Sequence, residues 1–185
     1  MSAAPGGCQT PHMAGEVVIR SVSEADAAAI AALYAHHVLH GTASYEIEPP
    51  GEGETLAKIR RITEAGWPFL VAELAGGLAG YAYVTQFRDR PAYRFACENS
   101  IYVRHDRVGM GVGTKLLEAL IEAAADFGFR QVVAVVGGAE PSSIALHRKC
   151  GFEEVGRLHQ VGFKFGKWLD TVYMQRELSR RHPTD

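Results

Sequence analysis

The stretch that decides the fold reads Asn99-Ser100-Ile101-Tyr102-Val103, then Val108-Gly109-Met110-Gly111-Val112-Gly113-Thr114-Lys115, then Leu116-Leu117-Glu118-Ala119-Leu120-Ile121. The first run is typical of a strand and the last of an amphipathic helix, so the glycines form a turn at a helix N-terminus. Backbone N–H groups there have no intrahelical partner, and the helix dipole adds partial positive charge. We therefore expect a cradle for an anion, in which glycines let phosphates approach the backbone closely.

The spacing of these glycines narrows the choice of anion. A P-loop needs four residues between glycines and then Gly-Lys-Ser/Thr, which this turn does not have. A dinucleotide fingerprint needs a βαβ unit with an acidic residue about 20 positions on, and the sequence indicates none. A diphosphate carrier of another kind fits better, and the alternative is a tight turn without a ligand.

The order of elements around the turn resembles a known family. Strand, glycine turn, helix, strand from 131 to 136, and a short helix between Pro141-Ser142-Ser143 and Gly151-Phe152 resemble the acetyl-CoA-binding half of the GNAT N-acetyltransferases. That family's turn reads Gln/Arg-x-x-Gly-x-Gly/Ala. This chain supplies Gly111 and Gly113 but has Val108 at the first position, with Arg107 one residue out of place.

Further motifs resemble the branch that acetylates phosphinothricin and methionine sulfoximine, over roughly 17 to 178. The most specific is the late run Gly-x-Lys-x-Gly-x-Trp-x-Asp, which spans Gly162 to Asp170 and has no generic structural reason to recur. The other matching positions are Phe87-Arg88, Tyr93, Glu98, Ile101-Tyr102-Val103, His147 and Gly151-Phe152.

The resemblance implies the α+β GNAT fold. This fold has a mixed, mostly antiparallel central sheet, flanked by about four helices and splayed in the middle for acetyl-CoA. We expect a flexible leader over 1–16, one domain over 17–178 and a tail over 179–185. The patterns predict strands at 17–20, 69–74, 78–84, 94–103 and 131–136, two more around a turn at 162–166, and helices from Ser23, at 54–65, 111–127 and 142–150.

Composition excludes several classes of protein. The 185 residues carry a net charge of −2 with scattered Lys and Arg, so no electrostatic footprint for nucleic acid is visible. No apolar run approaches about 20 residues, so we expect no membrane span, and the first sixteen residues lack the pattern of a signal peptide. Cys8, Cys97 and Cys150 are odd in number and far apart, which favours reduced thiols in the cytoplasm.

Two residues are candidates for acid–base chemistry. An ammonium group cannot attack a thioester, so an acetyltransferase needs a base. Glu98 lies in an otherwise apolar strand pattern, where an unpaired carboxylate has a raised pKa, and its match to the family's glutamate favours the base; the alternative is a solvent-facing edge residue. His147 stands where the branch has a histidine that could protonate the thiolate, and the alternative is a packing role.

The resemblance also assigns binding residues. Strand residues 101–103 would pair with the pantetheine arm like an added strand. The expected acetyl-CoA-binding residues are Ile101, Tyr102, Val103, Gly109, Met110, Gly111, Val112, Gly113 and Thr114. The family commonly has Asn at the position of Glu140, so Glu140 is left out.

An exposed loop resembles the branch's acceptor-binding loop. An arginine fork suits the carboxylate of an amino acid or a phosphinate, although loop arginines are often only solvated. The expected acceptor-binding residues are Arg88, Pro91, Ala92 and Tyr93, with Arg90 beside them. Tyr93 and Phe163 would wall the pocket or merely fill the core.

No metal is expected. His36 and His40 share a helix face beside His37, but no third ligand or nearby carboxylate completes a site.

The sequence therefore predicts a cytoplasmic acetyl-CoA-dependent N-acetyltransferase of a small amino-acid-like amine. It would act by direct transfer in a ternary complex and, by resemblance, as a homodimer. Two alternatives remain open: a non-catalytic acyl-CoA sensor, and an enzyme that acetylates a protein N-terminus or another amine. The retention of Glu98 beside an acceptor loop favours the enzyme.

Overall fold

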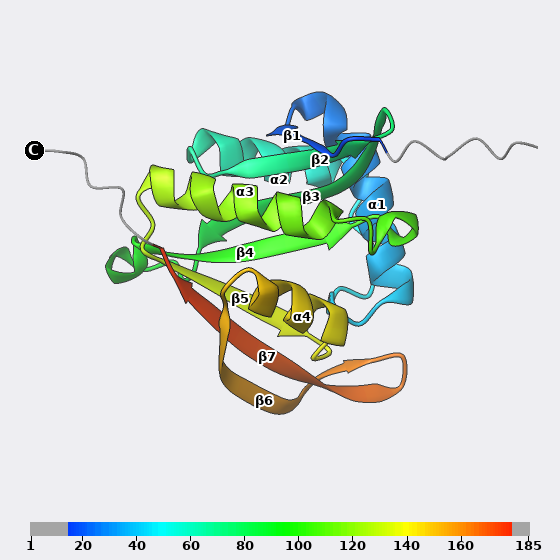
Figure 1. Cartoon of the computed structure of the whole chain (residues 1–185). Helices are drawn as coiled ribbons and strands as arrows, with labels where there is room; N and C mark the ends of the chain where they lie inside the picture. Colours follow the sequence, from blue (N-terminus) through cyan, green and yellow to red (C-terminus); the bar gives the residue numbers. More distant parts are fainter. Residues whose placement is uncertain (1–14, 179–185) are drawn as a thin grey trace, which may run out of the picture.

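The computed structural model describes residues 15–178, and its centre is one seven-stranded sheet (Figure 1). The strand order is β1-β2-β3-β4-β5-β7-β6, and only the β4–β5 pair is parallel. The strands are β1 (Val18–Ser21), β2 (Phe69–Leu74), β3 (Gly77–Gln86), β4 (Ala96–Val103), β5 (Gln131–Gly137), β6 (Glu153–Lys164) and β7 (Lys167–Glu177). The mixed, mostly antiparallel sheet predicted from the resemblance is confirmed.

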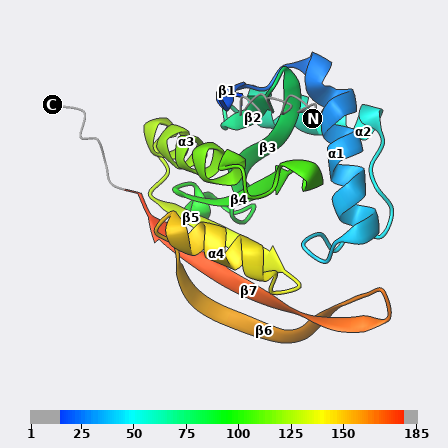
Figure 2. The same ribbon diagram turned by 45° about the vertical axis from the view of Figure 1, so that its right-hand side comes forward.

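Helices cover both faces of the sheet, two on each (Figure 2). They are α1 (Ala27–His40), α2 (Glu52–Glu64), α3 (Val112–Phe127) and α4 (Pro141–Lys149). One hydrophobic core lies under α1 and α2, and the other lies under α3 and the end of α4. Three short 3-10 turns, η1 (Glu24–Asp26), η2 (Pro91–Tyr93) and η3 (His105–Arg107), precede α1, β4 and α3.

Helix α3 forms where its pattern places it. Leu116, Leu117 and Leu120 recur on one face and are at most 1% exposed, and each such burial stabilises the fold by roughly 1.5–3 kcal/mol. The helix ends at Gly128, whose φ of 109° suits glycine alone and whose N–H donates to the carbonyl oxygens of Ala124 and Ala125.

Two local expectations are corrected by the structure. Helix α2 begins at Glu52, two residues before the predicted start, because the Gly51 N–H is capped by the Glu54 carboxylate. The β6–β7 turn is Phe165-Gly166 rather than the whole of 162–166, since both residues adopt positive φ as a two-residue hairpin requires. The glycine turn lies inside a βαβ unit, β4–α3–β5, and β5 carries no acidic residue, so the dinucleotide fingerprint is absent as expected.

The sheet splays between β4 and β5. Their ladder runs only from Ala96 opposite Gln131 to Asn99 opposite Ala134, after which the strands separate. Residues 100–103 of β4 and 135–137 of β5 therefore face a gap in the middle of the sheet, as the resemblance implied. Residues 1–14 and 179–185 lie outside the described residues, so the leader and tail remain predictions. Within 15–178, no helix has the length and apolar character that a membrane crossing requires.

Candidate active site

The glycine turn forms the N-terminus of α3 as predicted. Gly111 is the N-cap residue in a left-handed conformation with φ 79°, and no side chain within 15–178 caps this terminus. The N–H groups of the first turn therefore keep the hydrogen-bonding capacity that an anion needs. A Cβ built on Gly109 or Gly111 would meet nothing within 4 Å, so the space beside the turn is open.

A cleft of about 780 Å³ runs from this turn along the free end of β4. Ile101, Tyr102, Val103, Gly109, Gly111, Gly113 and Thr114 line it, as expected for acetyl-CoA-binding residues. Met110 is 53% exposed and Val112 is 1% exposed in the core, and neither lines the cleft. Helix α4 forms the other wall through Ser142, Ser143, Ala145, Leu146 and Lys149.

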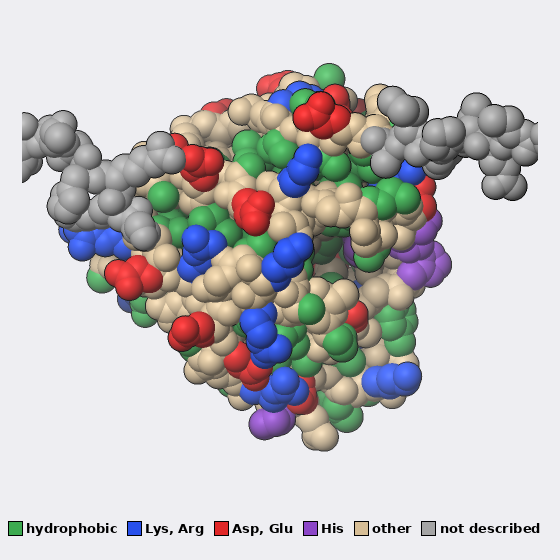
Figure 3. All heavy atoms as spheres, viewed as in Figure 1, with side chains coloured by type: hydrophobic (Ala, Val, Ile, Leu, Met, Phe, Trp, Pro, Cys, Tyr) green, Lys and Arg blue, Asp and Glu red, His purple; other side chains and the backbone are tan. Residues whose placement is uncertain are grey.

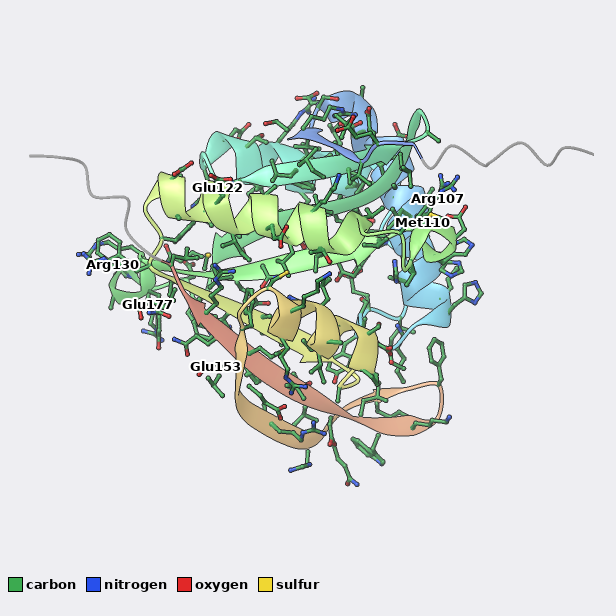
Figure 4. All side chains as sticks on the ribbon, viewed as in Figure 1. Arg107, Met110, Glu122, Arg130, Glu153 and Glu177 are labelled. Carbon is green, nitrogen blue, oxygen red and sulfur yellow. The ribbon has the colours of Figure 1, made fainter. Side chains whose placement is uncertain are left out.

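Two basic side chains lie at this cleft, although the first position of the family's turn, usually Gln or Arg, is Val108 in this chain. Arg107 lines the cleft, and its Nε is buried without a hydrogen-bond partner among the described residues, 3.9 Å from the Asp106 carboxylate. Figure 4 shows Arg107 and Met110 on the segment that leads into α3. Lys149 lies on the opposite wall, where its Nζ donates to Thr114 Oγ1 at 3.3 Å. Arg107 can thus supply a positive charge next to Val108, where the family's motif has a polar or basic residue.

Histidines gather at one rim of the cleft, on the side of α1 (Figure 3). The rings of His36 and His105 stack with centroids 3.9 Å apart, and His40 lies 4.8 Å from His36. His37 Nε2 lies 2.9 Å from the Val103 carbonyl oxygen at the end of β4. Within 15–178, no group of three or more His, Cys, Asp or Glu side chains has the arrangement of a metal site.

A second cleft of about 470 Å³ continues from the first on the other side of the splay. Ala43, Ile101, Tyr102 and Ser143 line both clefts. Glu98 and His147 line the second cleft, so the structure brings the two predicted catalytic residues together there.

Glu98 is a partly buried carboxylate with one cation beside it. Burial raises the pKa of its carboxyl, and the positive charge of Arg88 opposes part of that rise. Arg88 Nη1 lies 3.8 Å from Glu98 Oε2, and the Glu98 side chain is 31% exposed. A partly desolvated carboxylate beside a cleft is a stronger base than a fully solvated one.

His147 is held in one orientation and is 3% exposed. Its Nδ1 lies 2.8 Å from the Ser143 carbonyl oxygen, which can only accept, so Nδ1 carries the proton and Nε2 accepts from Asn99 Nδ2 at 3.0 Å. Burial lowers the pKa of the imidazole, and the Ser143 carbonyl raises it in part. Both nitrogens of the neutral ring are therefore hydrogen-bonded within the protein, which supports a structural role for His147.

The predicted acceptor loop lies beside the second cleft rather than in its wall. Pro91, Ala92 and Tyr93 form η2, and none of them lines either cleft. Arg88 reaches Glu98, while the Tyr93 ring lies edge-on to Phe87 with centroids 5.8 Å apart. Phe163 is 58% exposed against Trp168, so it neither walls the cleft nor fills the core.

Several lining residues were not found from the sequence. Tyr34 from α1 and the residues Ala43, Ser44, Tyr45 and Glu46 of the following loop form much of the second cleft. Tyr34 Oη and Ser44 Oγ lie 2.8 Å apart, and burial raises the pKa of Tyr34 to about 12. These residues carry no motif, so no local pattern in the sequence identifies them.

Neither described cysteine has the environment of a nucleophile. Burial raises the pKa of Cys97 to about 12, and burial also raises the pKa of Cys150. A thiolate is disfavoured at both positions, and neither lines the two clefts. The site therefore favours direct attack by an acceptor over a covalent enzyme intermediate.

Comparison with known proteins identifies the family of this chain. Residues 19–173 match the family model described as acetyltransferase (GNAT) domain. The chain belongs to the GNAT family of N-acetyltransferases. It is 49% identical over 162 residues to a phosphinothricin N-acetyltransferase of Alcaligenes faecalis, covering 87% of this chain and 82% of that protein.

Two further proteins are similar to this chain over most of its length. The chain is 40% identical to an L-methionine sulfoximine/L-methionine sulfone acetyltransferase of Pseudomonas aeruginosa, covering 86% of this chain and 94% of that protein. A crystal structure of a GNAT phosphinothricin acetyltransferase from Sinorhizobium meliloti in complex with acetyl-CoA superposes with a TM-score of 0.86. The two chains are 46% identical, and the match covers 88% of this chain and 89% of that one.

Proposed function

We propose that this enzyme transfers the acetyl group of acetyl-CoA to the amine of a small amino-acid-like acceptor, such as phosphinothricin, methionine sulfoximine or methionine sulfone. The observation that carries the proposal is that Glu98 lies in a cleft that meets the glycine-turn cleft at the splay of β4 and β5. Acetyl-CoA in one cleft and an acceptor in the other would bring thioester and amine together at the base. The acceptors named are those of the relatives.

The residues support a direct transfer. Glu98 takes a proton from the acceptor's ammonium group, and the free amine attacks the thioester carbonyl carbon. The tetrahedral intermediate collapses with cleavage of the C–S bond, and the CoA thiolate gains the proton that the nitrogen releases. The N–H groups at the start of α3 and the side chains of Arg107 and Lys149 would hold the phosphates of acetyl-CoA. Residues 101–103 would pair with its pantetheine arm.

The size and charge of the second cleft support a small zwitterionic acceptor. Its volume of about 470 Å³ suits a small molecule, and its charged lining residues are Glu46 and Glu98, which attract an ammonium group. Arg88, within 3.8 Å of Glu98, is the cation nearest the base and could hold the acceptor's carboxylate. Under this proposal Pro91, Ala92 and Tyr93 shape the loop that carries Arg88.

The proposal includes a homodimer and a cytoplasmic location. An apolar stripe on the β6–β7 hairpin, formed by Val161, Phe163, Phe165 and Trp168, is more than half exposed and could be covered by a second copy. Cys97 and Cys150 are buried free thiols, as suits a reducing compartment.

A panel assay tests the acceptor. Release of free CoA thiol from acetyl-CoA would be measured with phosphinothricin, methionine sulfoximine, methionine sulfone, ordinary amino acids and a short peptide with a free N-terminus. We expect turnover with the small analogues and none with the peptide. Acetylation of the peptide alone would overturn the acceptor class, and acetyl-CoA binding without any turnover would favour a sensor.

A further inference from the structure

Lys164 is a buried charged residue whose place the proposed chemistry does not explain. It lies near the end of β6 on the otherwise exposed β6–β7 hairpin, yet it is 5% exposed. Its Nζ donates to the carbonyl oxygens of Ser44 at 2.7 Å and Gly41 at 3.0 Å, and it lies 5.1 Å from the centre of the Phe165 ring. Burial lowers the pKa of this ammonium group, which shows that its charged form is partly desolvated. The two carbonyl contacts offset part of that cost.

The two carbonyl groups belong to the loop that walls the acceptor cleft. Gly41 and Ser44 bracket the turn after α1, and the residues from Ala43 to Glu46 line the cleft that contains Glu98. The bonds span more than a hundred residues of sequence, from β6 to the end of α1. Lys164 therefore connects the last hairpin with the acceptor wall.

Tyr45 makes a second connection between the same loop and β7. Its Oη donates to the Asp170 carbonyl oxygen at 2.9 Å, lies 2.7 Å from Thr171 Oγ1, and accepts from the Gly138 N–H at 3.1 Å. A Cβ on Gly162 would lie 2.8 Å from the Tyr45 ring, so only glycine leaves room for that ring. Gly162 and Lys164, the first two fixed positions of the late motif, thus both contact this loop.

We propose that Lys164 is a positioning residue for acceptor binding, which holds the segment 41–46 as the wall of the Glu98 cleft. This inference rests on the proposed function and gives the Gly-x-Lys part of the late motif a physical purpose. The segment also borders the acetyl-CoA cleft through Gly41, Thr42 and Ala43, but the α3 turn, β4 and α4 form most of that cleft. We call the two hydrogen bonds from Lys164 to Gly41 and Ser44 the clamp. Loss of the clamp should therefore weaken acceptor binding more than acetyl-CoA binding.

The test compares Lys164→Met with Lys167→Met, an exposed lysine on the same hairpin. Methionine keeps the apolar stem and removes all three donors. We expect Lys164→Met to raise the acceptor KM about tenfold or more, because two charge-assisted hydrogen bonds are lost, while the Kd of acetyl-CoA changes less than about threefold. Lys167→Met should leave both constants unchanged.

Hydrogen exchange supplies a readout that does not depend on turnover. Amides of 41–46 should exchange faster in Lys164→Met, with β4 and α3 unchanged. If Lys164→Met fails to fold, Tyr45→Phe tests the second anchor, and a smaller rise in acceptor KM is expected. Wild-type acceptor KM and wild-type exchange at 41–46 would overturn the proposal, and so would an equal loss of affinity for both substrates. If no small acceptor is turned over, the proposed function fails while the exchange experiment still tests the clamp.

Discussion

At the scale of single residues, neighbours decide the chemistry of Glu98 and His147. The same strand carries Glu98, which it leaves partly exposed, and Asn99, which contacts His147. Burial raises the pKa of the carboxyl and lowers the pKa of the imidazole. The carboxylate lies beside Arg88 with part of its side chain exposed, whereas both ring nitrogens are occupied. The two residues are therefore expected to respond differently to substitution.

Glu98→Gln removes proton acceptance with little change in shape. We expect turnover to fall about 100-fold or more with acetyl-CoA affinity nearly unchanged, because only the base is lost. Burial raises the pKa of Glu98, so the wild-type rate should fall as pH drops through a value above the ordinary one for glutamate, and this acid limb should vanish in the variant. The matched control is Glu177→Gln, an exposed glutamate at the end of β7, far from the α3 N-terminus (Figure 4). Retained turnover in Glu98→Gln would assign proton removal to water or another residue.

Burial of His147 predicts a pH dependence of stability. Its pKa is lowered in the folded state, so the unfolded chain binds more protons, and the free energy of unfolding should fall as pH drops below about 6.5. The slope is at most about 1.4 kcal/mol per pH unit for one group. Burial also lowers the pKa of His37, so His37 likewise makes the free energy of unfolding fall at low pH. The raised pKa of Glu98 has the opposite effect on the free energy of unfolding.

The His147 contribution is isolated by comparing wild type with His147→Gln in urea at pH 7.5 and 5.5. The stability advantage of the wild type should shrink at the lower pH, since the other groups contribute equally to both proteins. A constant difference between the two proteins would show that His147 does not titrate in this range.

At the scale of elements, the turn before α3 should bind through its backbone. Gly111→Ala places a methyl group in the open space beside the turn at φ 79°, so we expect acetyl-CoA affinity to fall at least about tenfold. Gly76→Ala is the matched control, because its φ is 77° and its Cβ also meets nothing within 4 Å, but it lies in the β2–β3 turn. Both changes cost about 1–2 kcal/mol of backbone strain, and only Gly111→Ala should change the Kd measured by calorimetry. Unchanged affinity in folded Gly111→Ala would remove the turn from the site.

The elements differ in how far the sequence could predict them. Helix α3 was predictable because its apolar period and Gly128 act locally. The β6–β7 turn was placed too broadly, because Gly162 is needed for the ring of Tyr45 and not for the turn. The place of Arg107 in the wall of the cleft could not be predicted either, since the motif compares positions in the chain while the lining depends on the path of η3.

At the scale of the whole molecule, the site arises where two parts of the sheet separate. β1 to β4 and β5 to β7 are joined by a short parallel ladder, and both clefts open beyond its end. The glycine turn and Glu98 are encoded in one continuous stretch, so they could be predicted. Ser44 and Tyr45, in the loop after α1, contact β6 and β7 across more than a hundred residues of sequence, and no local pattern encodes such contacts.

The sheet also leaves one edge apolar, and this predicts the assembly of the protein. Trp168 is 64% exposed and packs on Phe163 with ring centroids 5.0 Å apart, on a long hairpin whose outer strand β6 pairs only with β7 among the described residues. Such an edge exposes apolar area and unpaired backbone groups, which a second copy could cover.

We expect light scattering to give twice 20.1 kDa for the wild type and 20.1 kDa for Trp168→Glu, because a buried unpaired charge is costly. Val18→Glu, at an exposed position of the opposite edge strand β1, should leave the dimer intact. A wild type that stays monomeric at micromolar concentration, or a Trp168→Glu variant that stays dimeric, would contradict this assignment of the interface.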